Sequence, residues 1–134
     1  MDMKDINQET IEQFRAGGEI PGMHRERLVL LTTTGAKSGR PHTTPMMFVP
    51  DGERLLVIAS NMGAPKAPDW YVNLVADPMV QVEVGDESYR AAATPLTGEE
   101  YEQTWASIKK SYPFFADHEK QTSRMIPVVA VQRV

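Results

Sequence analysis

Short runs of apolar and β-branched residues recur along this chain, and their spacing predicts a fold made mainly of β-strands. Apolar and polar residues alternate strictly over 80–84, as in a strand with one buried face. The stretch 126–133 is apolar almost throughout, which predicts a strand in the centre of a sheet. In all we expect six strands, over residues 27–34, 43–49, 55–60, 80–84, 89–95 and 126–133.

Turn-forming residues between these runs predict how the strands connect. Pro-Asp-Gly-Glu at 50–53 separates the second strand from the third and is a strong hairpin signal. Gly85-Asp86 predicts another hairpin between the strands at 80–84 and 89–95. Strands joined in this way pair antiparallel, so we expect a meander.

Helical spacing is found in three segments, and we expect about four short helices in all. The first ends near Arg15, before glycines at 17–18 and a Pro-Gly turn at 21–22, and is expected to cover the core. The second covers about 69–77. The third runs from an N-cap at Thr97, with Glu100 completing a capping box, to about Ser111. The apolar positions are Ile6, Ile11 and Phe14 in the first helix and Tyr101, Trp105 and Ile108 in the third.

Hairpin-linked strands with short helices inserted between them predict a mainly β (α+β) fold, a small closed or partly closed antiparallel barrel. With 134 residues, 41% of them hydrophobic, the chain is long enough for one domain over 1–134, in which 1–22 form an N-terminal helical arm. There are no cysteines, which excludes disulfides and thiolate chemistry. A formal net charge of −4 argues against broad nucleic-acid binding. No apolar stretch is long enough to span a bilayer and no signal peptide is evident, so we expect a cytoplasmic protein.

The segment 30–42 is the most informative part of the chain. An apolar, β-branched strand pattern breaks there into a turn of small residues with Lys37, Arg40 and His42, and no Asp or Glu occurs from Leu28 to Pro50. Gly35 and Gly39 are expected to adopt backbone conformations closed to other residues, so that successive N–H groups face a bound anion. The alternative is a solvated loop between two strands.

Several familiar kinds of site are excluded or disfavoured by spacing. The turn lacks the Gly-x-x-x-x-Gly-Lys-Ser/Thr pattern of a nucleotide-phosphate loop. His24, His42 and His118 are far apart in a chain without cysteine, so we expect no metal site. A Gly-x-Ser-x-Gly elbow for a serine nucleophile is also absent.

What remains has the character of a cofactor cleft. Beyond the cationic turn, a strand ends near Ser60, a loop rich in Gly and Pro follows, and then come Trp70 and Asn73. A planar ring with an acidic tail needs an apolar or amide-lined slot and fixed positive charge. Trp70 could instead anchor the core, and Asn73 could simply bond a backbone carbonyl.

The series of motifs is specific in combination. It comprises Leu-Leu-Thr-Thr-Thr-Gly-Ala-Lys-Ser-Gly-Arg at 30–40, Thr-Pro-Met at 44–46, Ala-Ser-Asn-Met-Gly-Ala-Pro at 59–65, Trp-Tyr-Val-Asn-Leu at 70–74 and Arg-Met-Ile-Pro-Val at 124–128. Together these motifs resemble the deazaflavin (coenzyme F420)-dependent nitroreductase family, the A branch of the F420-dependent oxidoreductases. The resemblance implies a split β-barrel of the flavin- and deazaflavin-binding type. It also implies hydride transfer from reduced F420 to an electron-poor small molecule such as a quinone, an enone or a nitroaromatic.

The resemblance also assigns roles to individual residues. It implies that Ser60, Tyr112 and His118 serve catalysis. The cofactor contacts that it implies are Lys37, Ser38, Gly39, Arg40, His42, Pro45, Met47, Ser60, Asn61, Ala64, Trp70 and Asn73.

Some positions depart from the pattern of the family's nitroreductase prototype. Ala36 and His42 stand where that protein has arginines, and Met47, Phe115 and His118 stand where it has tyrosines. The missing phenols could polarise or protonate an acceptor. His118 is therefore a candidate proton donor, with a structural histidine as the alternative.

Other functions stay open at this point. They are an oxidoreductase that uses FMN on the same barrel, a non-catalytic deazaflavin carrier, and, more remotely, a nucleic-acid-binding barrel that stacks bases on Trp70 and Tyr71. The N-terminal helix could touch a membrane surface if the acceptor is a lipid-soluble quinone, although a core-capping role fits its charges better. The sequence makes no prediction of oligomeric state.

Overall fold

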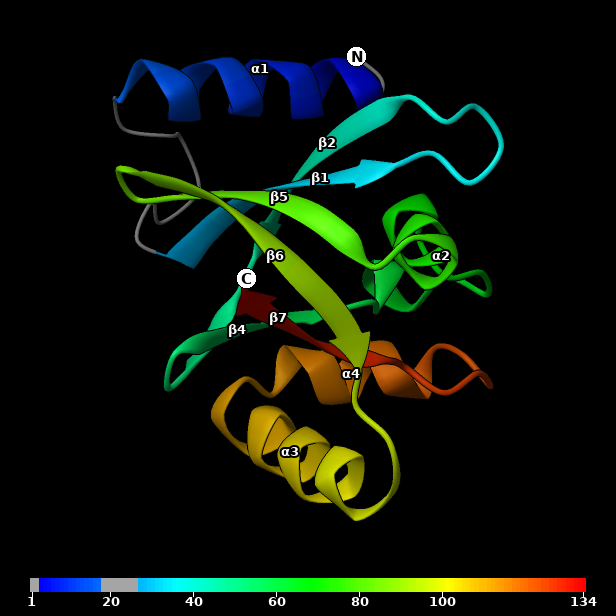
Figure 1. Cartoon of the computed structure of the whole chain (residues 1–134). Coiled ribbons are helices and arrows are strands. Elements are labelled where there is room, and N and C mark those ends of the chain that lie inside the picture. The colour runs from blue at the N-terminus through cyan, green and yellow to red at the C-terminus, as the bar shows by residue number, and fades with distance from the viewer. Residues whose placement is uncertain (1–2, 18–26) are drawn as a thin grey trace.

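The computed structural model describes residues 3–17 and 27–134, and its main feature is one antiparallel sheet (Figure 1). The strands are β1 (Leu28–Thr34), β2 (Pro41–Met47), β3 (Val49–Asp51), β4 (Arg54–Ile58), β5 (Met79–Val84), β6 (Glu87–Pro95) and β7 (Val128–Arg133). Their order across the sheet is β2-β1-β5-β6-β7-β4-β3. The helices are α1 (Met3–Ala16), α2 (Asp69–Ala76), α3 (Gly98–Ser111) and α4 (Phe114–Lys120), with a 3₁₀ turn η2 (Asn61–Gly63).

The sheet curls because its two edge strands, β2 and β3, follow one another almost without a break in the chain. β2 pairs with β1 at one edge and β3 pairs with β4 at the other, yet only Phe48 separates β2 from β3. Phe48 donates its N–H to the carbonyl of Arg27 at 3.0 Å and buries its ring inside the curl. The expected partly closed antiparallel barrel is therefore confirmed, with seven strands rather than six because 49–51 form a separate short strand.

The apolar runs in β1 and β7 reflect burial on both faces of the sheet. On β1, Val29 and Leu31 point into the curl, while Leu28 and Leu30 pack against α1. On β7, the interior residues are Val129 and Val131, whereas Val128 and Ala130 lie under α3 and α4. Since no face of either strand meets solvent over these residues, alternation disappears from the sequence.

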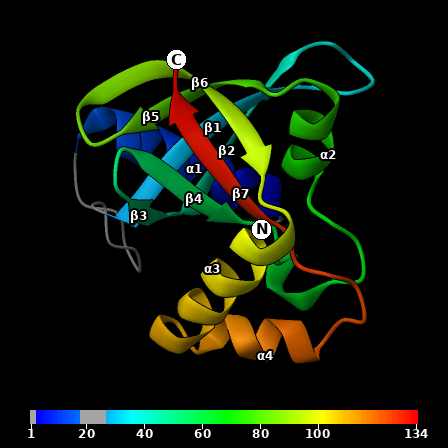
Figure 2. The same cartoon turned by 60° about the horizontal axis from the view of Figure 1, so that its bottom comes forward.

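Helices cover opposite ends of the barrel. Ile11 and Phe14 of α1 form a cluster with Leu28 and Leu30, which confirms the expected capping role. Gly17, at φ 82°, follows α1, while the side chain of Ile6, Gly18 and the expected turn at 21–22 lie outside the described residues. Figure 2 shows α3 and α4 side by side in front of the sheet with α1 behind it.

The predicted hairpins at 50–53 and 85–86 are confirmed as the β3–β4 and β5–β6 connections. The expected meander is wrong, because β1 pairs with β5 and β4 pairs with β7, so the strand order does not follow the chain. Strand 126–133 is also confirmed as central, between β6 and β4, although it begins at Val128. The predicted capping box is wrong: Thr97 is the N-cap of α3, but its side chain makes no capping bond, and Glu100 instead accepts a hydrogen bond from Arg54.

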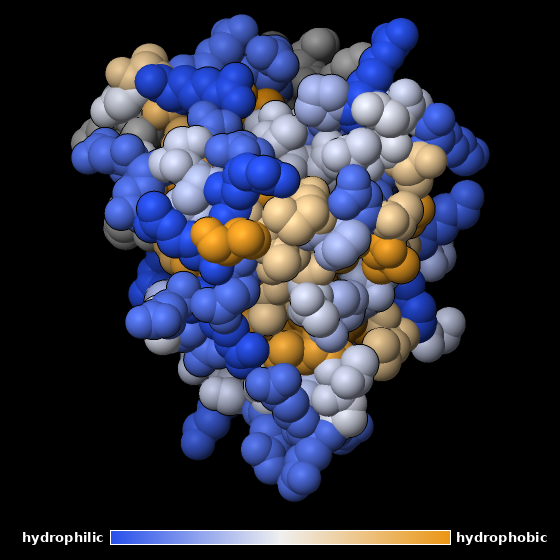
Figure 3. All heavy atoms as spheres, in the orientation of Figure 1, coloured by the Kyte–Doolittle hydropathy of each residue, from blue (hydrophilic) through white to orange (hydrophobic). Residues whose placement is uncertain are grey.

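The surface in the view of Figure 3 is mainly hydrophilic, with apolar side chains gathered in small patches near the middle of the face. None of the helices in the described ranges has both the length and the apolar character that crossing a bilayer requires.

Candidate functional site

The basic turn between β1 and β2 is closed by its own backbone. Gly35 donates its N–H to the carbonyl of Arg40 at 2.8 Å, and Gly39 donates to the carbonyl of Gly35 at 2.9 Å. Gly39 has φ 70°, as expected for a left-handed glycine. The Ser38 hydroxyl accepts the N–H of Arg40 at 3.2 Å, so the turn is held by bonds within itself.

Two details of the predicted anion nest are wrong. Gly35 does not adopt a positive φ; a side chain there would collide with Ser38 and with the His42 ring, so close packing excludes it. The N–H groups of Gly35, Ala36, Gly39 and Arg40 already have partners within the turn or on Asn73. An anion at this turn would therefore rely mainly on side chains rather than on a run of free backbone N–H groups.

Asn73 links the turn to helix α2. Its Oδ1 accepts the N–H of Ala36 at 3.0 Å, and its Nδ2 donates to the hydroxyl of Thr33 at 3.1 Å. Both Asn73 and Thr33 are buried. The alternative that Asn73 bonds a backbone carbonyl is wrong, because the backbone group it holds is a donor.

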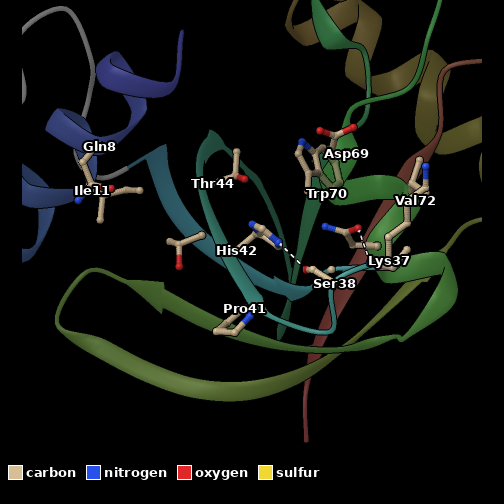
Figure 4. Close-up of a pocket in the computed structure, with 14 residues that line it drawn as sticks. Gln8, Ile11, Lys37, Ser38, Pro41, His42, Thr44, Asp69, Trp70 and Val72 are labelled. Atoms are coloured by element: carbon tan, nitrogen blue, oxygen red, sulfur yellow. Dashed lines mark hydrogen bonds between the residues drawn. The ribbon is translucent and has the colours of Figure 1, made fainter. Parts of the chain in front are cut away.

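A cavity of about 700 Å³ lies beside the basic turn and helix α2 (Figure 4). Figure 4 shows Gln8 and Ile11 of α1 on one side, Trp70 and Val72 of α2 on the other, and strand β2 between them. The cavity is lined by Gln8, Ile11, Gly35, Ala36, Lys37, Ser38, Pro41, His42, Thr43, Thr44, Asp69, Trp70, Val72 and Asn73. The expected cleft is thus confirmed in part: Lys37 and Trp70 line one cavity, but Ser60 is not among its lining residues.

The polar groups of the cavity suit an anionic ligand beside an aromatic wall. Lys37 is exposed, and His42 forms a 3.2 Å hydrogen bond with the Ser38 hydroxyl. Trp70 packs in the barrel core, which confirms its role as a core anchor, and it also lines the cavity, where the predicted contact with a cofactor ring stays a prediction. Asp69 places one carboxylate at the rim, which favours ligands that also carry hydrogen-bond donors.

A second group of polar and aromatic residues lies around Ser60. Ser60 is buried, and its Oγ lies 3.2 Å from Nδ1 of His118 on α4. Gly63, at φ 82°, packs so tightly against α4 that a side chain there would lie 3.0 Å from the carbonyl of His118. The 3₁₀ turn and α4 therefore form one packed unit.

Aromatic rings extend this unit along α4. The ring of Phe115 lies 5.9 Å from that of His118 and 6.4 Å from that of Tyr112, both nearly edge-on. Hydrogen bonds from the Trp105 indole and the Lys109 ammonium hold Glu119 and lower the pKa of its carboxyl. Because Trp105 and Lys109 are on α3, these bonds hold α4 against α3. The neighbouring residue on α4, His118, is the one that bonds Ser60.

The structure thus divides the predicted site residues into two groups. Lys37, Ser38, His42, Trp70 and Asn73 line the cavity, with Gly39 and Arg40 in the same turn and Pro45 further along β2. Met47, also on β2, packs instead against the apolar cluster of α3 and α4 that includes Phe115. Ser60, Asn61 and Ala64 lie in the loop after β4, where Ser60 meets His118, and Tyr112 belongs to the adjoining ring cluster. The loop 59–68 connects the two groups, since it leads directly into α2.

Some residues at the site were not predicted. Gln8 and Thr44 line the cavity, but nothing in their local sequence marks them. Asp69 also lines the cavity, whereas its sequence predicts only the start of a helix. Arg124 lies in a motif noted above, and its hydrogen bonds to the Ser60 loop are visible only in three dimensions.

Comparison with known proteins finds relatives of this chain by sequence. A family model described as "F420H(2)-dependent quinone reductase" matches residues 4–133. An F420H(2)-dependent quinone reductase of Mycobacterium tuberculosis is 36% identical over 122 residues, which cover 89% of this chain and 80% of that protein.

Solved structures of other proteins have a fold similar to that of this chain. A structure of an F420-H2-dependent reductase is similar with a TM-score of 0.71 and 40% identity, over 83% of this chain and all (100%) of that one. Another, described as a domain-swapped dimer, has a TM-score of 0.74 and 37% identity over 98% of this chain and 100% of that one. A haem storage protein of Vibrio cholerae, at 17% identity and a TM-score of 0.62, shares the fold alone.

Proposed function

The chain belongs to the F420H(2)-dependent quinone reductase family, and we propose that it binds reduced F420 with the basic turn and the Ser60 loop and transfers its hydride to a quinone. The observation that carries this assignment of residues is the cavity shared by Lys37, His42 and Trp70. The nitroreductase activity suggested by the sequence resemblance stays a prediction.

The residues present fit this cofactor on three observations. The cavity is too large for a lone phosphate, at about 700 Å³, and is long enough to reach from α1 to α2. Its cationic end carries Lys37, with Arg40 in the same turn, where an acidic tail needs positive charge. Trp70 offers an apolar wall suited to a planar ring.

In this proposal each group of residues has a separate task. Lys37, Ser38, Arg40 and His42 bind the phosphate and glutamyl tail. Trp70 packs beside the ring, with Pro45 on β2, and Asn73 holds the turn in place. Met47 faces the α3 and α4 cluster, beside the Ser60 end of the site. The bound cofactor supplies the hydride itself, so the chain's contribution is alignment and the exclusion of water.

Ser60 and His118 stand at the reactive end of the proposed site. The Ser60 hydroxyl is buried and, within residues 3–17 and 27–134, bonds His118, and we assign it to orienting the ring. His118 is half-buried, and among the described residues its ring bonds through Nδ1 alone, so Nε2 is assigned to deliver a proton to the reduced acceptor. Tyr112 and Phe115 form the apolar wall beside them.

The function is tested with the purified full chain. Reduced F420 and a soluble benzoquinone or naphthoquinone should give oxidised F420, followed by the return of its visible absorbance, and FMN should not replace it. A protein that binds F420 without turnover would instead be a carrier, and one that purifies with bound flavin would support the FMN alternative.

Lys37→Ala should weaken binding of F420 by about 10-fold, because a charge-assisted hydrogen bond to the tail is lost. A deazaflavin that lacks the phosphate and glutamyl tail should bind the variant and the wild type equally, which isolates the tail contact. Lys110→Ala on the exposed side of α3 is the matched control. Fluorescence titration with both compounds measures the effect, and equal weakening for the two would contradict this role of Lys37.

A further inference from the structure

Arg124 is a half-buried arginine between α4 and β7, and two of its side-chain hydrogen bonds end on the loop that carries Ser60. Its Nη2 donates to the carbonyl of Ser60 at 2.8 Å, and its Nε donates to the carbonyl of Ala64 at 3.0 Å. These two carbonyls flank the 3₁₀ turn Asn61–Gly63. One planar guanidinium therefore holds both ends of the turn.

The segment around Arg124 holds Ser60 from several directions. Pro127 accepts the N–H of Ala59 at 3.0 Å, just before Ser60 in the chain. His118 bonds the Ser60 hydroxyl, and Arg124 bonds the Ser60 carbonyl. The segment is itself anchored, since the Tyr101 hydroxyl donates to the carbonyl of Ile126 at 2.7 Å.

The loop needs such support because its backbone is unusual. Asn61 has φ 47°, the only positive φ of a non-glycine among the described residues, and Gly63 has φ 82°. Glycine adopts this conformation without strain, but a left-handed non-glycine such as Asn61 persists when surrounding contacts impose it. The Asn61 side chain contributes one such contact, to the carbonyl of Lys66 at 3.0 Å, and Arg124 contributes two.

Arg124 does not serve an ion pair in the part of the chain that the structure describes. Its donors go to carbonyl oxygens, including a longer bond of 3.4 Å to Met125. Lysine would keep the charge but could not reach two carbonyls with fixed geometry. Substituting lysine for Arg124 therefore tests the two-carbonyl geometry of the guanidinium while the positive charge is kept.

We propose that Arg124 is a positioning residue that fixes the Ser60–Ala64 loop and so places the Ser60 hydroxyl against the cofactor. The inference rests on the proposed function for its catalytic consequence, but the effect on the loop is independent of it. Arg124 touches neither cofactor nor acceptor in this scheme.

The test compares Arg124→Lys with Arg90→Lys, an exposed arginine on β6. Arg124→Lys should lower kcat about 10-fold, since small misplacements of reacting groups are costly, while the Kd for oxidised F420 and the thermal midpoint stay near those of Arg90→Lys. Arg124→Ala should recover part of its kcat when ethylguanidinium is added, but not with ethylammonium. Amide hydrogen exchange over 61–64 should be faster in Arg124→Lys than in the wild type.

Each outcome decides the inference. Wild-type kcat in Arg124→Lys, or a loss of kcat that only follows a loss of thermal stability without rescue by ethylguanidinium, would overturn it. If the wild type reduces no quinone, the proposed function fails, and the exchange measurement still decides whether Arg124 holds the loop. Unchanged exchange over 61–64 overturns the inference in either case.

Discussion

Asn73→Ala should lower the free energy of unfolding by about 2–4 kcal/mol and weaken F420 binding as well, because one side chain serves both the core and the basic turn. The substitution leaves the N–H of Ala36 and the hydroxyl of Thr33 without their partner. The Thr33 hydroxyl is buried, and a buried polar group left unpaired costs about 1–3 kcal/mol, while the part-buried bond of the Ala36 N–H adds a smaller loss. For a chain of this length the thermal midpoint should fall by about 10 °C.

Two comparisons make this prediction specific. Gln81→Ala removes the exposed hydrogen bond to Ser88 and should change stability by less than about 0.5 kcal/mol. Thr33→Val combined with Asn73→Ala should cost less than the sum of the single changes, since the two side chains share one bond. Urea unfolding monitored by tryptophan fluorescence measures stability, and titration measures binding. An Asn73→Ala protein with wild-type stability would contradict the proposed link between α2 and the turn.

The fold was largely predictable because burial leaves a direct mark on sequence. β1 and β7 are apolar on both faces since the barrel interior lies on one side and helices on the other. Glycines mark the hairpins at Gly52 and Gly85 because both have positive φ. Helix α4 was not placed, since its seven residues are too few to establish a period.

The site was predictable in its residue types and less so in its contacts. The basic turn could be found from charge and glycine, but Asn73 meets Ala36 across 37 positions of the chain and Arg124 meets Ser60 across 64. Such contacts depend on how the helices dock on the barrel, which no local pattern encodes. The same limit explains Gly35, whose role comes from the packing of Ser38 and His42 against it rather than from its own φ.

Ser60→Ala and His118→Phe should each lower kcat by about 100-fold, the first because the ring loses its orienting hydroxyl and the second because the proton donor is lost. His118→Phe keeps a ring against Phe114 and Phe115 but removes the nitrogen that bonds Ser60. Ser60→Ala removes the other half of the same bond. Binding of oxidised F420 should change little in either variant, because the tail contacts lie at the basic turn.

The double variant separates a coupled pair from two independent residues. If Ser60 and His118 act through their 3.2 Å hydrogen bond, removing both should cost about as much as removing one. His118→Asn provides the matched control, since its amide can bond the Ser60 hydroxyl but cannot deliver a proton. Recovery of kcat in His118→Asn would assign His118 to positioning alone, and continued loss would assign it to proton transfer as well. Single-turnover oxidation of reduced F420 with a quinone measures all four proteins. The fold losses in kcat of Ser60→Ala and His118→Phe would multiply in the double variant if the two residues acted independently. That result, or wild-type kcat in His118→Phe, would show that the bond between the two side chains has no part in the reaction.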